Sequence, residues 1–352
     1  MGPWRERRLN TSERGSIPLR RASRPGTRLT GEASQPGRGE RIGPVSPAGV
    51  MSVTVMRPIA FRVRDHEFTW DPGRPRALIM GIVNVTPDSF ADGGRFLEAE
   101  AAYAHALALA AEGADLIDVG AESTRPGSSG ISAAEERDRL LPVLERLLRE
   151  PPCPISVDTS KPDVAEAALA LGAHMVNDVT GLAGGPALAR VCARHGAGLG
   201  LVHMRGTPRT MQEAPHYDDL LGEVREWLAV AVAEAEAAGV PPEAICVDPG
   251  VGFGKTVTHN LTLLKRIDAL APLGKPVLVG PSRKSFIGAL LGVPPAERLE
   301  GTLAACIAAV HAGAQILRVH DVGAVRRAVR VAEAIRDAPD GEDALDPRRS
   351  RG

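Results

Sequence analysis

The sequence contains little cysteine and no long apolar run. Its four cysteines are widely scattered, without the paired spacing that would hold zinc or build a disulfide framework, so we expect reduced, structural thiols. No stretch of about 18 apolar residues suggests a membrane-spanning helix, and no secretory signal precedes the first foldable segment. These absences favour a cytoplasmic protein that acts on neither membranes nor nucleic acids.

The net charge of −1 conceals a basic leader. Residues 1–50 contain ten arginines, no lysine and four glutamates, and they are rich in Gly, Pro and Ser. Such a segment buries too little apolar surface to fold, so we expect a disordered leader over 1–55. The favoured interpretation is an extension upstream of a true start at Met51 or Met56, while a native disordered or nucleic-acid-binding arm and a targeting segment stay open. The charged tail 338–352 is also expected to be disordered.

Eight short runs rich in Val, Ile and Leu recur along the chain without alternating apolar and polar residues. That pattern is typical of parallel strands covered by helices on both faces. Segments of helical period follow each run. The runs are 77–83, 116–120, 155–158, 175–179, 200–204, 245–248, 277–280 and 316–319. The helical segments are 98–112, 133–149, 162–171, 185–195, 217–238, 258–271, 295–312 and 322–334.

Eight strand–helix units predict a (β/α)₈ TIM barrel over residues 56–337. A doubly wound sheet is the alternative, but it usually has fewer strands and a Gly-rich turn after the first. Here the first run leads instead into Asn84-Val85-Thr86-Pro87-Asp88. Segments 59–63 and 67–70 alternate around a polar turn, which predicts a β-hairpin ahead of the barrel that could close its floor.

Polar and ionisable residues follow the carboxyl ends of the runs, and in such a barrel these ends converge on one pocket. They are Asn84, Asp158, Asn177, Asp178, His203, Asp248, Lys284, Arg318 and His320. Asp158, Asn177 and Asp248 suit a planar, donor-rich ring. Lys284, in the cluster Ser-Arg-Lys-Ser at 282–285, could serve a ring or an anion.

The other set, Asn84, Arg318 and His320, suits an anion or its metal. Loops after the last two strands of this fold commonly hold phosphate, which favours a functional His320. Simpler alternatives exist for some members of the first set. Asp158 could be only a helix cap, and Asp178 should point away from the face that its neighbour Asn177 uses.

His203 could be a buried histidine with satisfied hydrogen bonds, and we assign it no role. The segment 248–255 looks superficially like a phosphate-binding loop but lacks the Gly-Lys-Ser/Thr ending. Its glycines more plausibly let the backbone pass close to a flat ligand, with Phe253 at the rim. The long polar loops 86–94 and 123–130 are typical of lids.

Taken together, these motifs resemble those of the dihydropteroate synthases, over roughly residues 59–335. The matching segments are GIVNVTPDSF (81–90), ESTRPG (122–127), SVDT (156–159), NDVTG (177–181), HM (203–204), DPG (248–250), SRKSF (282–286) and RVHD (318–321). Arg205 departs from the pattern, and the leader has no counterpart. The resemblance implies a homodimeric (β/α)₈ transferase that joins 6-hydroxymethyl-7,8-dihydropterin pyrophosphate to p-aminobenzoate with Mg²⁺.

The resemblance also implies residue roles. Asp158, Asn177 and Asp248 would bind the pterin edge, with Val179 and Met204 against the ring. The residues implied as catalytic are Lys284, Arg318, His320 and Asp158. Those implied to bind pyrophosphate are Asn84, Arg318 and His320. Asn84 would also ligate the metal. Those implied around p-aminobenzoate are Phe90, Thr124, Pro126, Phe253 and Ser285, and those in the lids are Thr86, Asp88, Ser89, Ser123 and Arg125.

Two alternatives remain open. A pterin-binding methyltransferase domain shares the barrel but needs neither the two lids nor a pyrophosphate site. A non-catalytic paralogue would keep the fold for binding alone.

Overall fold

The computed structural model describes residues 60–71, 73, 75–85 and 94–339, the side chains of 94–98 excepted. The leader 1–55 and nearly all of the tail 338–352 lie outside these ranges, so their predicted disorder and the domain limits 56–337 stay predictions. Within the described ranges, no helix combines the length and apolar character needed to cross a bilayer.

Eight parallel strands form one sheet in the order β8-β7-β6-β5-β4-β3-β10-β9. A bridge between Val247 in β8 and Val277, which precedes β9, brings the two ends of this order together, so the sheet nearly closes on itself. The predicted (β/α)₈ barrel is therefore confirmed. Its strands are β3 (Leu78–Asn84), β4 (Leu116–Gly120), β5 (Ile155–Asp158), β6 (Met175–Asp178), β7 (Gly198–Val202), β8 (Ile245–Asp248), β9 (Leu278–Val279) and β10 (Ile316–Val319).

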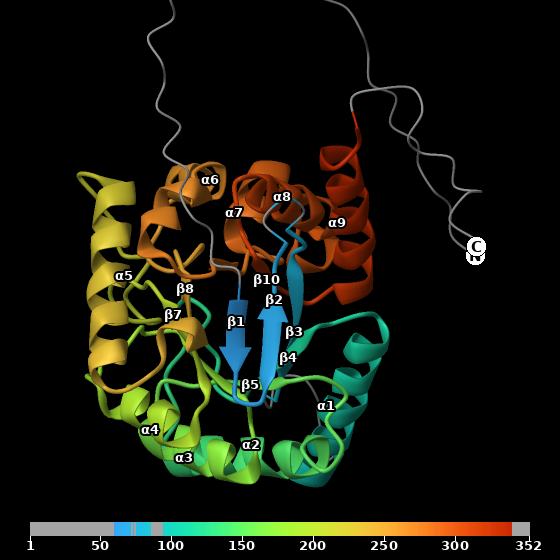
Figure 1. The fold of residues 1–352 in the computed structure, drawn as a ribbon, viewed down its shortest axis with the longest axis vertical. Helices are drawn as coiled ribbons and strands as arrows, with labels where there is room; N and C mark the ends of the chain where they lie inside the picture. Colours follow the sequence, from blue (N-terminus) through green and yellow to red (C-terminus); the bar gives the residue numbers. More distant parts are fainter. Residues whose placement is uncertain (1–59, 72, 74, 86–93, 340–352) are drawn as a thin grey trace, which may run out of the picture. The chain divides into compact units, whose positions relative to one another are not determined.

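Helices surround the strands, as Figure 1 shows. They are α1 (Gly94–Ala111), α2 (Ala133–Leu147), α3 (Pro162–Leu171), α4 (Ala187–His195), α5 (Leu220–Ala237), α6 (Val257–Lys265), α7 (Ser285–Leu291), α8 (Leu299–His311) and α9 (Val322–Arg336). Local sequence sets their ends. The Ser132 hydroxyl accepts a hydrogen bond from the Glu135 amide and caps α2, and Gly172, at φ +113°, ends α3 in a left-handed conformation.

Two predicted helices differ from the observed ones. The segment 258–271 is divided, because Arg266 leaves helical geometry and α6 gives way to the 3₁₀ helix η3 (Ile267–Leu273). The segment 295–312 begins as another 3₁₀ turn, η4 (Pro295–Glu297), and becomes α-helical only at Leu299. The short helix α7 lies outside the predicted helical segments, because two glycines in and after it, at 288 and 292, weaken the helical pattern.

The predicted hairpin is confirmed and closes the barrel floor. Strands β1 (Ala60–Val63) and β2 (His66–Thr69) pair in antiparallel fashion, and Figure 1 shows them lying across the ring of strands. Phe61 and Val63 are fully buried there, and Trp70 is nearly so. They pack against side chains near the amino ends of the barrel strands, namely Met80, Leu116, Met175, Cys246, Leu278 and Ile316. Because this end is filled with apolar side chains, polar chemistry belongs to the opposite end.

Candidate active site

A buried ion cluster joins three strands inside the barrel. The Arg318 side chain, from β10, donates from Nε to Asp118 Oδ2 at 2.6 Å and from Nη2 to Asp158 Oδ2 at 2.7 Å. Asp118 is fully buried and Asp158 nearly so. Burial opposes the charge on Arg318, but the two carboxylates outweigh it and raise its pKa. Asp158 is thus an ion-pair partner, and the N-cap position of α3 belongs to Lys161 instead.

Asp118 was missed in the sequence, where it stands in the middle of the run 116–120. A carboxylate inside a buried strand is costly unless it is paired, so this lone acid was itself a signal. Its Oδ2 holds Arg318 from within the barrel. Burial raises the pKa of the neighbouring Asp158 to about 7, against the opposing effect of Arg318, and Asp118 adds to the rise.

Several buried acceptors near this cluster have no protein donor. Among the described residues these include Asp118 Oδ1, Ser156 Oγ and Asn177 Oδ1. The three strands are neighbours, because Asp118 is in register with Ser156, and Asp158 with Asn177. Buried polar atoms are nearly always paired in folded proteins. These acceptors are therefore suited to a ligand that carries N–H groups.

Two glycines keep space beside the acceptors. A Cβ atom at Gly200 would lie 2.8 Å from Asn177 Oδ1, and one at Gly120 would lie 3.1 Å from the Asp158 Cβ. Neither glycine has a positive φ, so glycine is explained here by its lack of a side chain. The result is room for a flat group next to Asn177 and Asp158.

Asp248 and Lys284 belong to the same mouth as Arg318. A Cβ atom at Gly280 would lie 3.7 Å from the Arg318 Cβ and 3.9 Å from Lys284 Nζ. Burial lowers the pKa of Lys284 to about 8, against the opposing effect of Asp248. Burial likewise raises the pKa of Asp248, whose Oδ1 accepts a hydrogen bond from the Gly250 amide at 2.7 Å.

The glycines of the segment 248–255 lie close to other parts of the protein's own chain. A Cβ at Gly250 would lie 1.8 Å from the His203 carbonyl oxygen, and one at Gly252 would lie 2.8 Å from the Lys284 Cδ, both at positive φ. These close approaches explain why glycine is needed at both positions, while the predicted approach to a flat ligand stays a prediction. Phe253 lies half-buried with the Lys284 ammonium 4.4 Å from its ring centroid.

Ser282, to which no role was assigned from the sequence, holds His320 in place. The His320 Nδ1 lies 3.0 Å from Ser282 Oγ, and its backbone amide donates to the same oxygen at 3.2 Å. Burial lowers the pKa of His320 to about 4, and Arg318 and Arg283 add to the effect. His320 is therefore neutral near pH 7, so it can offer an anion a hydrogen bond rather than a charge.

The remaining strand-end residues hold the scaffold. Asp178 accepts hydrogen bonds from the turn that follows it, including the Leu182 amide at 2.7 Å. His203 is a buried histidine whose Nδ1 lies 2.9 Å from Lys255 Nζ, and burial lowers the pKa of His203 to about 3. Arg205 turns outward, pairing with Glu223 at 3.1 Å. Lys255, whose pKa burial lowers to about 7, was missed because it reads as the end of a glycine-rich loop.

Four other predicted site residues lie in the described part of the chain, and four more lie outside it. Asn84 is exposed at the carboxyl end of β3, in register with Gly120. Ser285 is exposed at the start of α7. Val179 is buried and Met204 half-buried. Thr86, Asp88, Ser89 and Phe90 lie outside the described residues.

The second predicted lid loop, 123–130, is described throughout together with its flanking residues 122 and 131. The Ser128 hydroxyl donates to the Ser123 carbonyl oxygen at 2.7 Å, and the Gly127 amide donates to the Pro208 carbonyl oxygen at 3.0 Å. Thr124 is half-buried and Pro126 exposed. Arg125 is close enough to His320 to help lower its pKa. The loop therefore extends over the mouth of the barrel.

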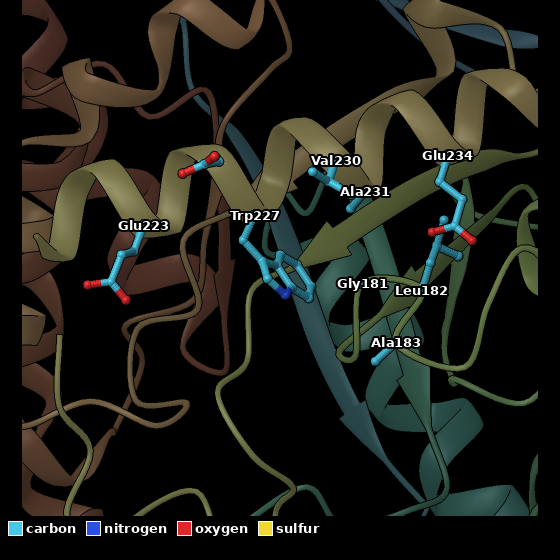
Figure 2. A pocket seen from close by; sticks show the side chains of 9 residues that line it. Gly181, Leu182, Ala183, Glu223, Trp227, Val230, Ala231 and Glu234 are labelled. Atoms are coloured by element: carbon cyan, nitrogen blue, oxygen red, sulfur yellow. The ribbon is translucent and has the colours of Figure 1, made fainter. Parts of the chain in front are cut away.

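An outer hollow of about 450 Å³ is a poor alternative site (Figure 2). It lies between α5 and the turn after β6, where the Trp227 ring lies close to Gly181. Its charged lining residues are Glu223, Glu226 and Glu234. This lining would repel an anion, and the buried ion cluster makes no contribution to it.

A (β/α)₈ barrel that gathers buried charged groups at the carboxyl ends of its strands is typical of enzymes. The comparisons agree, because a family profile described as "Pterin binding enzyme" matches residues 80–320. Dihydropteroate synthase from Synechocystis is 47% identical over 261 residues, covering 74% of this chain and 90% of that protein. The chain belongs to the pterin-binding enzymes and, within them, to the dihydropteroate synthase family.

Two solved structures from Xanthomonas albilineans extend the likeness to the fold. Its dihydropteroate synthase with 4-aminobenzoic acid has a TM-score of 0.73 at 44% identity, covering 80% of this chain and all of that one. The same enzyme in complex with 7,8-dihydropteroate has a TM-score of 0.70 at 43% identity, covering 79% of this chain and all of that one.

Proposed function

We propose that this protein catalyses the dihydropteroate synthase reaction. It condenses 6-hydroxymethyl-7,8-dihydropterin pyrophosphate with p-aminobenzoate, giving 7,8-dihydropteroate and pyrophosphate in folate synthesis. The observation that carries the proposal is the set of buried acceptors beside Arg318, in a chain of this family. Related enzymes have been solved with 4-aminobenzoic acid and with 7,8-dihydropteroate.

The pterin would lie against Asn177 Oδ1, which has no protein donor, and against the carboxylates of Asp158 and Asp248. Its amino group and ring N–H groups are donors, and they match the oxygens of Asp158, Asn177 and Asp248. Hydrogen bonds to charged groups contribute about 1.5–3 kcal/mol each when both partners are satisfied. Val179 and Met204 would cover the ring, and Lys284 would donate to its carbonyl oxygen and ring nitrogen.

The pyrophosphate would lie nearer the rim, against Arg318, His320 and Asn84. In the described part of the chain, the one gathering of three His, Cys, Asp or Glu ligands is Asp65, His66 and His174 at the hairpin, away from this rim. Mg²⁺ commonly takes few protein ligands and uses substrate phosphates and water for the rest. The amide oxygen of Asn84 fits that arrangement, and Mg²⁺ bound there would neutralise charge on the departing pyrophosphate.

The reaction needs no protein nucleophile. The bond from the exocyclic methylene carbon to oxygen breaks, its electron pair leaves with pyrophosphate, and the dihydropterin ring delocalises the resulting cation. The aniline nitrogen then bonds to the carbon and loses a proton. Asp158 and Asp248 keep negative charge beside this cation, while Arg318 and Lys284 stabilise the leaving group and the ring oxygen.

The p-aminobenzoate ring would lie between the lid loops and Phe253, near Thr124 and Pro126. Phe90 is proposed to complete this slot, and the lid residues Thr86, Asp88, Ser89, Ser123 and Arg125 to close over it. The exposed hydroxyl of Ser285 is proposed to bind the carboxylate.

We also propose a cytoplasmic homodimer formed through outer helices. Large apolar side chains are exposed there, with Leu290 and Leu291 on α7 more than half exposed, and Val331 and Ile335 on α9 even more so. Exposed apolar patches commonly mark protein interfaces. Light scattering on the purified protein would measure the assembly, and a monomer at micromolar concentration would contradict the dimer.

Pyrophosphate release tests the function. Purified protein given both substrates and Mg²⁺ should release pyrophosphate and form dihydropteroate in equal amounts, and omission of p-aminobenzoate should abolish product formation. A methyltransferase domain would bind the pterin but release no pyrophosphate. A non-catalytic paralogue would bind both substrates without turnover, and either outcome would contradict the proposal.

A further inference from the structure

A partly buried lysine network anchors the loop 122–131, which contains the second predicted lid. Lys161, in the loop after β5, donates from Nζ to Glu122 Oε2 at 2.8 Å and to Glu136 Oε2 at 2.5 Å. Glu122 begins the loop 122–131, whereas Glu136 lies in the first turn of α2, just beyond the loop's end. One ammonium group therefore joins both sides of the lid.

Glu122 also fastens the two ends of the loop to each other. Its Oε1 accepts a hydrogen bond from the Ile131 amide at 2.8 Å. A Cβ at Gly130 would lie 3.0 Å from the same oxygen, so the loop closes tightly on this carboxylate. The loop's conformation thus depends on where Lys161 holds Glu122.

The network is partly buried, because the side chains of Lys161 and Glu122 are only 25% and 18% exposed. Glu136 is fully buried, and its Oε1 has no protein hydrogen-bond partner. Burial opposes the charge on Lys161, but Glu122 and Glu136 outweigh it and raise its pKa. A buried carboxylate needs a counter-charge, so Lys161 is fixed in place by Glu136 and is not free to follow the loop.

The same network is adjacent to the pterin site. Lys161 follows Asp158 by three residues, and Glu136 is close enough to Asp158 to contribute to its raised pKa. Thr124 and Pro126, proposed around p-aminobenzoate, lie on the loop that Lys161 anchors. The network therefore spans the distance between the two substrate sites.

We propose that Lys161 is a positioning residue, which holds the lid loop 122–131 in the conformation that binds p-aminobenzoate and ties that loop to the strand end carrying Asp158. It touches neither substrate, and it acts through Glu122. The expected effect on the KM for p-aminobenzoate rests on the proposed function. The expected effect on the conformation of the loop does not.

Kinetics of Lys161→Met with each substrate varied provide the first test. The KM for p-aminobenzoate should rise roughly tenfold or more, because misplaced binding groups are costly, while the KM for the pterin substrate should change by less than about twofold. Lys161→Arg should recover much of the loss. Equal rises in both KM values would overturn the proposal.

Lys275→Met is the matched control. Lys275 is more deeply buried than Lys161, and its Nζ donates to Glu236 Oε1 at 2.6 Å and to the Pro242 carbonyl oxygen at 2.8 Å, but it precedes β9 at the amino end of the barrel. Its loss should leave both KM values unchanged. A rise in the KM for p-aminobenzoate equal to that of Lys161→Met would overturn the proposal.

Amide hydrogen exchange of residues 123–130 separates this proposal from the proposed function, because it needs no activity. Exchange should become faster in Lys161→Met and stay unchanged in Lys275→Met, and unchanged exchange in both would overturn the proposal even if wild-type enzyme releases pyrophosphate. If Lys161→Met fails to fold because Glu136 loses its counter-charge, Glu122→Gln decides, since it keeps the Lys161–Glu136 pair and weakens only the link to the loop.

Discussion

The floor and the mouth of this barrel are made by the same eight strands but have opposite chemistry. At the floor, Phe61, Val63 and Trp70 seal the barrel with apolar side chains. At the mouth, Asp118, Asp158 and Arg318 bury charge, and several acceptors lack a protein donor. The difference teaches that one end of the barrel is closed by apolar packing, whereas the other keeps charged groups whose burial is costly unless they are paired.

Removing the central charge of the mouth should have the largest effect. Arg318→Met leaves two buried carboxylates without a counter-charge, so the free energy of unfolding should fall by about 3–5 kcal/mol. Pyrophosphate binding should weaken by about 2–5 kcal/mol. Urea denaturation and calorimetric titration measure the two losses. Arg283→Met, which breaks an exposed pair with Asp321, is the control and should cost about 0–1 kcal/mol.

Weakening the floor should change stability alone. Phe61→Ala removes a fully buried ring and should lower the free energy of unfolding by about 3–5 kcal/mol. Both KM values should stay at wild-type levels, because no proposed substrate contact lies at this end. Chemical denaturation together with steady-state kinetics checks both parts. A large rise in either KM would show that the two ends are not independent.

The pH dependence of kcat/KM should follow the titratable groups at the mouth, because the floor is sealed by apolar side chains. Asp158 must be ionised to accept from the pterin, and burial raises its pKa from 3.8 to about 7, so kcat/KM should fall about tenfold per pH unit below 7. Lys284, whose pKa is lowered to about 8, should cause a fall above 8. Because folded Asp158 holds its proton more tightly than the unfolded chain, its contribution to stability should decrease from about pH 4 to 7. A flat kcat/KM profile would contradict this assignment.

A smaller change tests the room left beside the acceptors. Gly200→Ala places a Cβ 2.8 Å from Asn177 Oδ1, and such overpacking typically costs about 1–3 kcal/mol. The KM for the pterin substrate should therefore rise roughly tenfold. Gly184→Ala is the control, because a Cβ there meets no atom within 4 Å. Equal effects of the two substitutions on KM would argue against a ligand beside Asn177.

The smallest effect is expected at the rim. Ser285→Ala removes one proposed hydrogen bond to the p-aminobenzoate carboxylate, about 1 kcal/mol, so its KM should rise roughly fivefold. Lys284→Ala, one residue earlier, should instead lower pterin affinity and turnover. Initial rates with each substrate varied distinguish the two. If both variants changed the same KM values and kcat in the same way, Lys284 and Ser285 would not serve different substrates.

Much of this architecture could be predicted from the chain. The eight apolar runs predicted the barrel, and the alternation around Arg64-Asp65-His66 predicted the hairpin. The positions of Asp158, Asp248 and Arg318 at strand ends predicted that they lie at the mouth. Asp118 was missed because an inward-facing acid within a strand has a meaning only once its partner, 200 residues away, is known.

The pattern of helices was harder to predict in detail. Arg266 breaks the helix after β8 through its backbone angles, with no Gly or Pro at that position to signal it. The Lys161 network was hidden for a different reason, because Glu122, Glu136 and Lys161 lie in three separate elements.

The barrel's weakest seam lies between β8 and β9, where the Val247–Val277 bridge joins the ends of the sheet and β9 is two residues long. Asp248 flanks this seam on one side and Lys284 on the other. A heterocycle that binds both would act as a staple across the gap. Substrate would then tighten the ring that holds it, and the enzyme's resistance to heat should increase with the concentration of its own pterin.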